Sequence, residues 1–423
     1  MENSKQKFTS NTIWSLIGRV FQVGVTFITT MLIARYLGPE KHGIITLSYS
    51  YVYIFTSIAS LGLNDIVVKE LLDKDNDKSE VLGTMLTLKT IASLLSIGLV
   101  YLVITSINDS SIVVTVTMLQ SLSLIFQICD SLTYYYQSEL LFKKVAIITI
   151  ISYGLTTIFR IVGLINKYDT EWFAIAVSLD FLLVSVINMI AYFSDGNKLK
   201  FSKKMVKPLL AKSYNYIFAS VMINIYSRAD TIILGEMINE TNVGYYNAAT
   251  TICNAWPIIL LAIIDSARPI IIDLYENNRK EYEKRYKQLY ASIFYISVAV
   301  AIVFIVFSNL IISIIYGKEY MPATLPLKIV CLGTAFSYFG VARGIWMQCE
   351  NKIKYEKIIY LLGAIINIVL NLILIKMYGI AGAAVAIALT QFFTNFVVIY
   401  LIKETRDNAK LMIDGILLKG VFK

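Results

Sequence analysis

Four basic side chains lie well inside long apolar stretches of the chain: Arg19, Lys89, Arg160 and Arg228. Placing such a charge at the centre of a bilayer costs about 2.5–3.5 kcal/mol, so each should face a partner or a water-filled cavity. A guanidinium offers a planar fork of N–H donors that matches a phosphate, and an ammonium acts as a point charge. We therefore expect these residues to hold an anion in a cavity, with scattered interhelical ion pairs as the alternative.

Two acidic residues, Asp180 and Asp230, lie in the same kind of stretch. Asp180 has no basic neighbour in its own segment, so it could pair across helices with Arg160 or Lys89, or bind a coupling cation. Asp230 follows Arg228 by two residues, and side chains two apart point about 200° away from each other on a helix. These two cannot neutralise each other, so one should face the cavity and the other a neighbouring helix.

Three more features bear on the chemistry. Asp265 and Arg268 are three residues apart at the end of an apolar stretch, so they share a helix face. A structural ion pair at the end of the span is therefore one interpretation of these two residues. Arg343 lies close to the end of its stretch, where a long side chain can reach the interface. The four cysteines show no disulfide or metal-ligand spacing, and no cofactor or metal is expected.

The elements that position these residues follow from the composition. The 423 residues are 57% hydrophobic and only 16% charged, with a mean hydropathy of +0.66, whereas soluble domains are about 25% charged. A soluble enzyme and a disordered chain are excluded, which leaves an all-α polytopic membrane protein. Stretches of about 20 apolar residues predict about twelve transmembrane helices. Their predicted ranges are 12–34, 43–63, 81–105, 112–135, 145–165, 172–193, 214–237, 243–264, 289–315, 325–347, 356–375 and 380–402.

Basic residues predict how these segments are oriented. With a cytoplasmic N-terminus, 27 Lys and Arg fall in cytoplasmic segments and 5 on the opposite side. This is the positive-inside bias, and it explains the net charge of +9 without a nucleic-acid partner. Both termini are therefore predicted to be cytoplasmic.

Three short matches relate the two halves of the chain in the same order. LGPEKHGIITL (37–47) resembles INETNVGYYNA (238–248), QSELLFKK (137–144) resembles QCENKIKY (348–355), and FAIAVSL (173–179) resembles AAVAIAL (383–389). The offsets of 201, 211 and 210 predict a duplicated six-helix unit, whose copies are parallel repeats around a central cleft. The expected organisation is an N-terminal six-helix lobe (1–195), a cytoplasmic linker (196–213), a C-terminal six-helix lobe (214–402) and a cytoplasmic amphipathic tail (403–423).

Two charged cytoplasmic stretches could form amphipathic helices on the inner leaflet. Residues 275–290 repeat tyrosine among charges, and residues 403–423 mix five cations with eight large apolar residues. A solvated charged loop is the alternative for each, and it is the weaker one for the tail.

The chain also resembles a known family in three segments. RYLGPEKHGIITLSYS (35–50), YGKEYMPATLPLKIVCLG (316–333) and YGIAGAAVAIALTQ (378–391) look like the Wzx-type polysaccharide flippases of the multidrug/oligosaccharidyl-lipid/polysaccharide exporter superfamily. The resemblance extends over essentially the whole chain. It implies translocation of an undecaprenyl-diphosphate-linked oligosaccharide across the bacterial cytoplasmic (inner) membrane, for O-antigen or another surface polysaccharide, with no chemistry on the substrate.

The resemblance also implies site residues and partners. In this family a V-shaped cavity carries cations that engage the diphosphate or acidic sugars. The implied partners are the lipid-linked oligosaccharide, membrane lipids, a coupling cation, and a polysaccharide polymerase with its chain-length regulator. The implied substrate-binding residues are Arg19 and Arg268, with Lys89, Arg160 and Arg228 in addition, and the implied ion-coupling residues are Asp180 and Asp230.

Other functions fit the sequence less well. A drug or lipid II exporter of the same superfamily would share the architecture, but cationic drugs favour acidic cavities and lipid II flippases often have two more spans. A membrane polysaccharide polymerase would need a large outward loop, and the outward loops here are short. An O-acyltransferase would need a histidine in the membrane, and the only histidine is His42 in a loop. Enzyme activity is therefore not expected.

Overall fold

The computed structural model describes residues 2–422, with side chains from residue 10 onward except those of residues 215 and 219. Within that range every regular element is a helix and there is no strand, so the predicted all-α class is confirmed. The chain divides into two compact units, Met1–Asn224 and Ile225–Lys423, called here the N-terminal and the C-terminal unit.

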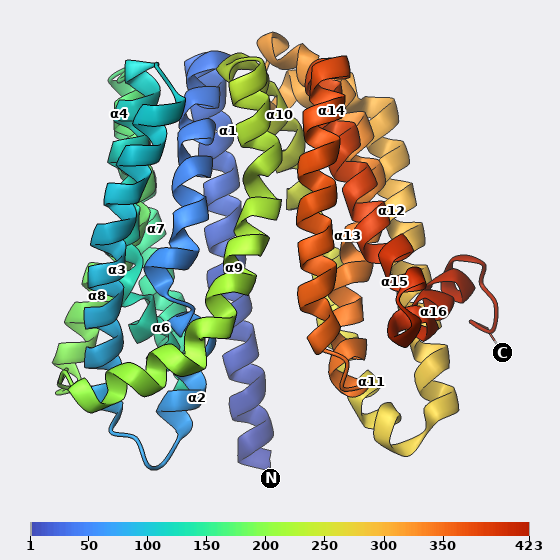
Figure 1. Ribbon diagram of the computed structural model, residues 1–423, viewed down its shortest axis with the longest axis horizontal. Helices are drawn as coiled ribbons and strands as arrows, with labels where there is room; N and C mark the ends of the chain where they lie inside the picture. The colour runs from blue at the N-terminus through green and yellow to red at the C-terminus, as the bar shows by residue number, and fades with distance from the viewer. Residues whose placement is uncertain (1, 423) are drawn as a thin grey trace. The chain divides into compact units, whose positions relative to one another are not determined.

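The N-terminal unit is built around α1, which packs against α3, α4, α7 and α8 (Figure 1). The boundary to the C-terminal unit falls inside the long helix α9. The elements of the N-terminal unit are α1 (Glu2–Ser60), η1 (Leu63–Asp65), α2 (Val67–Leu72), α3 (Lys78–Ile107), α4 (Ser111–Ser121), α5 (Ser123–Phe126), η2 (Gln127–Cys129), α6 (Asp130–Ser138), α7 (Phe142–Ile165), α8 (Thr170–Ser194) and the first part of α9 (Lys203–Met237).

The C-terminal unit is built around α13, which packs against α10, α11, α12 and α14. A short last helix, α16, packs against α12 (Figure 1). The elements after α9 are α10 (Glu240–Ala255), α11 (Ile258–Asn277), α12 (Arg279–Ile315), η3 (Lys318–Ala323), α13 (Thr324–Cys349), α14 (Lys354–Phe392), the π-helix η4 (Phe393–Val397), α15 (Val398–Leu401), η5 (Lys403–Thr405) and α16 (Arg406–Ile416).

The two longest apolar segments each contain two spans. The first segment, Ser10–Ser60, has 51 residues. As one straight helix it would extend about 75 Å, more than twice the hydrocarbon thickness of a bilayer. Gly38 (φ 77°, ψ 172°) breaks this segment just before Pro39, and Gly379 (φ 58°, ψ −134°) breaks α14 in the same way. The described residues contain ten long apolar helices. Because two of them are double, they agree with about twelve predicted spans.

The predicted fourth span, 112–135, is not one continuous helix. It is divided among α4, α5, η2 and α6. Side chains of neighbouring helices bind the backbone carbonyls that these breaks release: Ser93 Oγ donates to Leu124 O (2.8 Å) and Ser178 Oγ to Leu119 O (2.8 Å). A broken helix is tolerated at this depth because such donors satisfy its backbone.

The backbone supports the predicted repeat. Leu140 ends the turn after α6 with φ 57°, and Asn351, 211 residues later, ends the turn after α13 with φ 55°. The next N–H in each copy donates back to a helical carbonyl: Leu141 N to Tyr136 O (2.9 Å) and Lys352 N to Met347 O (2.8 Å). This is the same helix-ending motif at the same register, and its offset equals that of the sequence match.

The residues predicted as a linker, 196–213, include the first turns of α9. Their beginning is held against α3 of the same unit, because Lys200 N donates to Ser79 O (3.0 Å) and Ser202 N to Thr84 Oγ1 (3.0 Å). A Cβ on Gly83 would lie 2.3 Å from Lys200 O, so this approach requires glycine.

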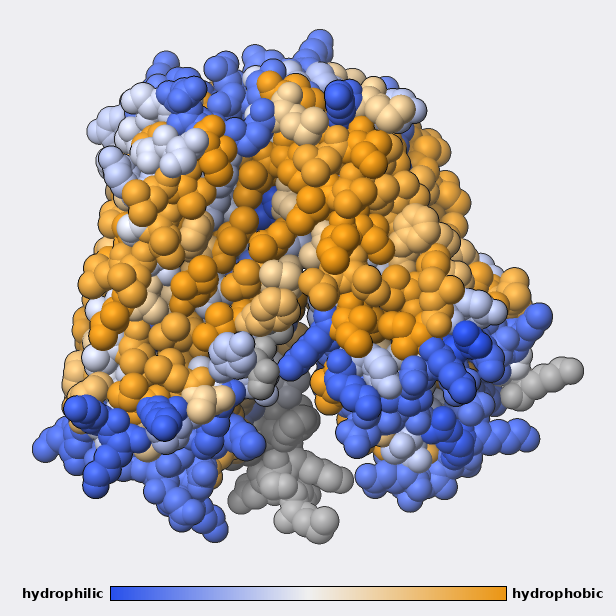
Figure 2. All heavy atoms as spheres, in the orientation of Figure 1, coloured by the Kyte–Doolittle hydropathy of each residue, from blue (hydrophilic) through white to orange (hydrophobic). Residues whose placement is uncertain are grey.

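The surface of each unit shows a belt of hydrophobic residues between two hydrophilic ends (Figure 2). On α12 the belt includes strongly exposed side chains such as Ile302, Val306 and Ile314. Monomeric soluble proteins rarely expose apolar patches of this extent, whereas a bilayer covers them. The chain is therefore a multi-pass membrane protein.

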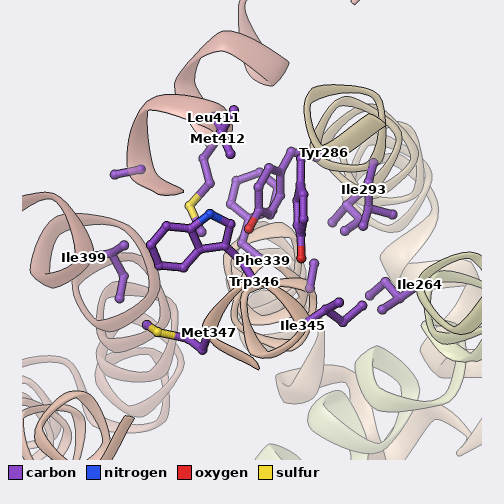
Figure 3. Close-up of a cluster of buried hydrophobic side chains, with 14 of the residues drawn as sticks. Ile264, Tyr286, Ile293, Phe339, Ile345, Trp346, Met347, Ile399, Leu411 and Met412 are labelled. Carbon is purple, nitrogen blue, oxygen red and sulfur yellow. The ribbon is translucent and has the colours of Figure 1, made fainter. Parts of the chain in front are cut away.

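The tyrosine-rich stretch 275–290 is helical on both sides of a sharp turn at Asn278, where α11 gives way to α12. Tyr282, Tyr286 and Tyr290 follow one face of α12 at intervals of four residues, and all three are fully buried. They pack with Trp346 of α13 and with α16 in the main core of this unit (Figure 3). The prediction of a helix is confirmed, but these three tyrosines contact protein and not the membrane surface.

Candidate functional site

The N-terminal unit contains a buried ion pair between α7 and α8. Arg160 Nη2 lies 2.5 Å from Asp180 Oδ2, and the side chains are 7% and 11% exposed. Of the two cross-helix partners considered for Asp180, the structure selects Arg160. Arg160 Nη1 and Asp180 Oδ1 have no hydrogen-bond partner among the described residues. The pair therefore leaves one guanidinium donor unused, while the side chain of Thr156 lies close to the carboxylate.

A second polar contact joins α7 to α1 in the same unit. Gln22 Nε2 lies 2.6 Å from the hydroxyl oxygen of Tyr153. Tyr153 is also close enough to Asp180 and Arg160 to interact electrostatically with both. Gln22, Tyr153, Arg160 and Asp180 form what we call the N-unit polar seam, which links three spanning helices.

Lys89 is buried and fully hydrogen-bonded. Its ammonium, 1% exposed, donates to Asn64 Oδ1 (3.0 Å), Ile128 O (3.0 Å) and Ser131 Oγ (3.3 Å). All three N–H groups are used, and Ile128 belongs to the 3₁₀ break in the fourth span. In this arrangement Lys89 stabilises the broken helix, and its hydrogen-bond partners are not those of the N-unit polar seam.

Arg19 lies on an exposed face of α1, between the exposed apolar residues Leu16 and Val20. It makes no ion pair with any side chain that the structure describes. Among the four predicted in-span cations, it is therefore the one whose charge is most accessible.

In the C-terminal unit, Asp230 is buried (4% exposed) and both of its oxygens are occupied. Oδ1 accepts the backbone N–H of Thr231 (2.8 Å), and Oδ2 accepts the hydroxyl of Tyr246 from α10. Arg228, on the same helix, is half-buried. A cation at Asp230 would have to replace the tyrosine hydroxyl.

Asp265 and Arg268 form the predicted pair on one face of α11. Asp265 Oδ1 and Arg268 Nη2 are 3.6 Å apart, and the side chains are 66% and 44% exposed. Exposed pairs of this kind contribute little to stability, so their charges remain available to other partners.

The expectation that the side chain of Arg343 reaches the interface is wrong. Arg343 is 1% exposed, and its Nη1 donates to Asn395 Oδ1 at 2.9 Å. Its Nε has no hydrogen-bond partner, and no carboxylate of the described residues lies within ion-pair distance. Tyr360 is within hydrogen-bonding reach, and Glu356 is the nearby acid. Arg343 is thus a buried cation with neutral hydrogen-bond partners.

Two features surround this arginine. Asn395 lies in the π-helix η4, a local widening that often occurs at functional sites, and its own amide donates to Gln391 Oε1 (2.8 Å). A Cβ on Gly340 would lie 2.4 Å from Asn395 Oδ1, so glycine gives the amide its space. In the sequence, this site could have been found from two polar residues inside a span, Gln391 and Asn395, and from a glycine one turn before Arg343.

These features define a class: a helical multi-pass membrane protein with charged residues buried among its spans. The chain belongs to the polysaccharide biosynthesis protein family, whose sequence profile matches residues 8–275. The profile of the MatE family matches residues 216–373.

Individual relatives agree with this assignment. The chain is 22% identical to a protein named as an O-antigen transporter in Shigella flexneri, over 89% of this chain and 93% of that protein. It is also 22% identical to the capsular polysaccharide biosynthesis protein CapF of Staphylococcus aureus, over 90% and 95%. It is 24% identical to the low-salt glycan biosynthesis flippase Agl15 of Haloferax volcanii, over 88% and 79%.

Solved structures share the fold at low sequence identity. The lipid II flippase MurJ superposes with a TM-score of 0.75 at 14% identity, over 96% of this chain and 91% of that one. An inward-facing multidrug transporter of the MATE family superposes with a TM-score of 0.70 at 11% identity, over 94% and 98%. The predicted fold, two halves of six helices, is therefore confirmed.

Proposed function

We propose that this chain is a flippase that moves undecaprenyl-diphosphate-linked oligosaccharide repeat units from the inner to the outer leaflet of a bacterial cytoplasmic membrane. The observation that carries the proposal is the family match over residues 8–275. Relatives named for O-antigen transport and capsular polysaccharide biosynthesis support it. The product would serve O-antigen or another surface polysaccharide.

The physical problem is to carry a charged, hydrated head through hydrocarbon while the polyprenyl tail stays in lipid. Alternating access solves it without breaking any bond, so we propose that the chain is not an enzyme. Cations in the spans would compensate the diphosphate charge during passage. Binding must be strong enough to withdraw the head from one leaflet and weak enough to release it at the other.

We assign the substrate-binding role to five cations and the coupling role to two acids. Arg19 and Arg268 are accessible, Arg228 is half-buried, and Lys89 and Arg160 would first have to leave their present partners. At Asp180 a coupling cation would take the place of Arg160, and at Asp230 it would take the place of the Tyr246 hydroxyl. The proposed substrate-binding residues are Arg19, Lys89, Arg160, Arg228 and Arg268.

The remaining parts of the proposal concern the cell. Both termini would be cytoplasmic, as the distribution of basic residues predicts. A polysaccharide polymerase and its chain-length regulator would receive the translocated unit. Membrane lipids would surround the hydrophobic belt of each unit.

Leaflet accessibility of the substrate tests this function. The protein is reconstituted in liposomes with a fluorescent undecaprenyl-diphosphate oligosaccharide, and a membrane-impermeant reductant bleaches the outer leaflet. Transport brings the inner pool to the outside, so bleaching should approach completion. Arg19→Ala and Arg228→Ala each remove charge-assisted hydrogen bonds of about 1.5–3 kcal/mol, which corresponds to a roughly ten- to hundredfold slower exchange.

The matched control is Lys376→Ala, which removes an exposed cation near the end of a span and should leave the rate unchanged. Wild-type rates for Arg19→Ala, Arg228→Ala and their combination would remove the cation-site assignment. The same assay with lipid II or with a cationic dye tests the other exporters of the superfamily. Faster exchange of either compound than of the oligosaccharide lipid would overturn the proposed substrate class.

A further inference from the structure

The C-terminal tail is attached to its own unit by specific contacts. Asn408 and the hydroxyl of Tyr290 hydrogen-bond to each other (2.9–3.1 Å), and Lys287 Nζ lies 2.8 Å from Asp414 Oδ2. Leu411 and Met412 of α16 are buried against Tyr286 and Trp346 (Figure 3). The apolar face of α16 is therefore used for packing on protein, which revises the expectation that this face enters the inner leaflet.

The residues after α16 remain apolar and exposed. Leu417 is 55% exposed, Leu418 is 38% exposed and Phe422 is 82% exposed. Val421 between them is buried, and its carbonyl accepts the amide of Gln288 on α12 at 2.9 Å. The backbone of this segment is thus fixed while three large side chains point away from the core. We call residues 417–422 the C-terminal hook.

Contacts with α12 fix the depth of the hook along the membrane normal. Gln288 ends the charged part of α12, and the apolar part follows from Leu289. Gln288 contacts Val421, and the hydroxyl of Tyr295, seven residues further along, donates to Ile416 O (2.9 Å). Seven residues correspond to about 10 Å of helix. The hook therefore lies where α12 changes from charged to apolar, the level of a bilayer interface.

Four cations of the tail are exposed, and one of them, Lys410, lies 3.4 Å from the carboxylate of Asp407. Lys403, Arg406, Lys410 and Lys419 are all exposed, against the exposed acids Glu404 and Asp407. Lys287 is already paired with Asp414. The exposed charge of the tail is consequently net positive, which complements acidic lipid headgroups.

We propose that the C-terminal hook inserts Leu417, Leu418 and Phe422 into the interface of an anionic bilayer, with the neighbouring cations on lipid phosphates. The predicted orientation makes this the cytoplasmic leaflet. Apolar residues backed by basic ones are the pattern of interfacial anchors, and basic residues near an anionic surface are attracted to it. The hook would tie α12 and α13 to the membrane surface through the docked helix α16.

Local fluorescence in the full-length protein tests this. An NBD group is placed on Phe422→Cys or Leu418→Cys in a Cys349→Ser background, because Cys349 is the one native cysteine that is not buried. The protein is reconstituted in nanodiscs with doxyl-labelled lipid. We expect blue-shifted emission and quenching by the doxyl label at both positions. The matched control is Lys280→Cys, an exposed position at the charged start of α12, which should emit as in water.

A second experiment varies the charge of the lipid. Quenching at position 422 should be ~2-fold stronger in discs with phosphatidylglycerol than with phosphatidylcholine alone, and 0.5 M salt should reduce the difference. The variant Lys403→Gln/Lys410→Gln/Lys419→Gln should show no preference. Equal spectra at 422 and 280 would overturn the insertion. A lipid preference that survives the triple variant would overturn the role of the cations. Neither readout depends on transport, so the outcome is independent of the proposed function.

Discussion

Asn371 lies 211 residues after Arg160, the same offset that separates the left-handed residues Leu140 and Asn351. The repeat thus places a neutral amide in the C-terminal unit where the N-terminal unit has an arginine. Asp180 likewise corresponds to Thr390 at the offset of 210 found for the sixth span. Asn371 and Thr390 are both fully buried. The buried ion pair therefore belongs to one copy of the repeat only.

The buried cation of the C-terminal unit occupies a different position. Arg343 is held by Asn395 on the π-helix and has no carboxylate partner within the described part of the chain. One unit thus neutralises its deep arginine, and the other leaves a deep arginine with neutral partners. This difference suggests different tasks for the two units, and the first two predictions separate them.

The first prediction concerns Arg160 and Asp180. Asp180→Asn leaves a buried guanidinium without its counter-charge and should destabilise the protein by about 3–5 kcal/mol. Arg160→Met/Asp180→Leu removes both charges and should restore most of this stability, because buried pairs are often replaceable by apolar residues. Thermal unfolding of the detergent-solubilised variants measures both effects.

Transport by the same variants decides the role of Asp180. If Asp180 couples a cation, the double variant should be stable but unable to accelerate exchange in an ion gradient. Wild-type coupling in the double variant would show that the pair is only structural. Asp230→Asn, which keeps an acceptor for Tyr246, is the parallel test in the C-terminal unit.

The second prediction concerns Arg343. Asn395→Ala removes a hydrogen bond to a buried charge and should cost about 1.5–3 kcal/mol. Arg343→Met removes the buried charge itself and should be tolerated better, since the nearby acid Glu356 is only partly buried. If Arg343 serves only packing, Arg343→Met should also transport normally. We expect it to be folded and slow, with unfolding midpoint and exchange rate measured on the same preparation.

These two arginines show how far the sequence could lead. Depth along a straight helix identified Arg160 and Asp180 as residues that need partners, and their pairing was one of two options considered. The same counting placed Arg343 near an interface, because distance from a helix end says nothing about what covers the side chain. The π-helix that brings Asn395 to it has no recognisable sequence pattern.

The fold was more accessible than the site. Apolar length and the distribution of basic residues predict the spans, because the bilayer imposes both. The break of the fourth span at Gln127–Cys129 was not predictable, since it depends on donors from other helices, including Lys89. For the same reason the three hydrogen bonds of Lys89 could not be inferred from its own segment.

The third prediction uses two glycines with opposite surroundings. Gly38 has φ 77° and ψ 172°, a conformation that other residues adopt only under strain. Gly38→Ala should therefore lower stability by about 1–3 kcal/mol. Gly98 lies inside α3 with nothing within 4 Å of a Cβ built on it, so Gly98→Ala should raise stability by about 0.5–1 kcal/mol. Thermal unfolding of the pair should show shifts of opposite sign, and equal shifts would contradict the break at Gly38.

The last prediction concerns pH and the pair Lys144–Asp195 at the end of α8. Lys144 Nζ lies 2.5 Å from Asp195 Oδ2, and the hydroxyl of Tyr136 donates to the same oxygen (3.1 Å). These hydrogen bonds, that from Lys144 first, lower the pKa of Asp195 below its usual value. A carboxyl whose pKa is lower in the folded state stabilises the fold above its unfolded pKa of about 4. This contribution is lost as the pH falls through the folded pKa.

The unfolding midpoint of the wild type should therefore exceed that of Asp195→Asn at pH 6, and the difference should shrink steadily below about pH 4. The pair is partly exposed, so the effect should be small and should weaken further at high salt. Lys144→Gln removes the same pair from the other side and serves as the control. It should remove most of the same pH-dependent part, because Asp195 then loses the donor that lowers its pKa most and keeps only the hydroxyl of Tyr136. A wild-type advantage over Asp195→Asn that is constant from pH 6 to pH 3 would show that Lys144 does not act on the ionised carboxylate.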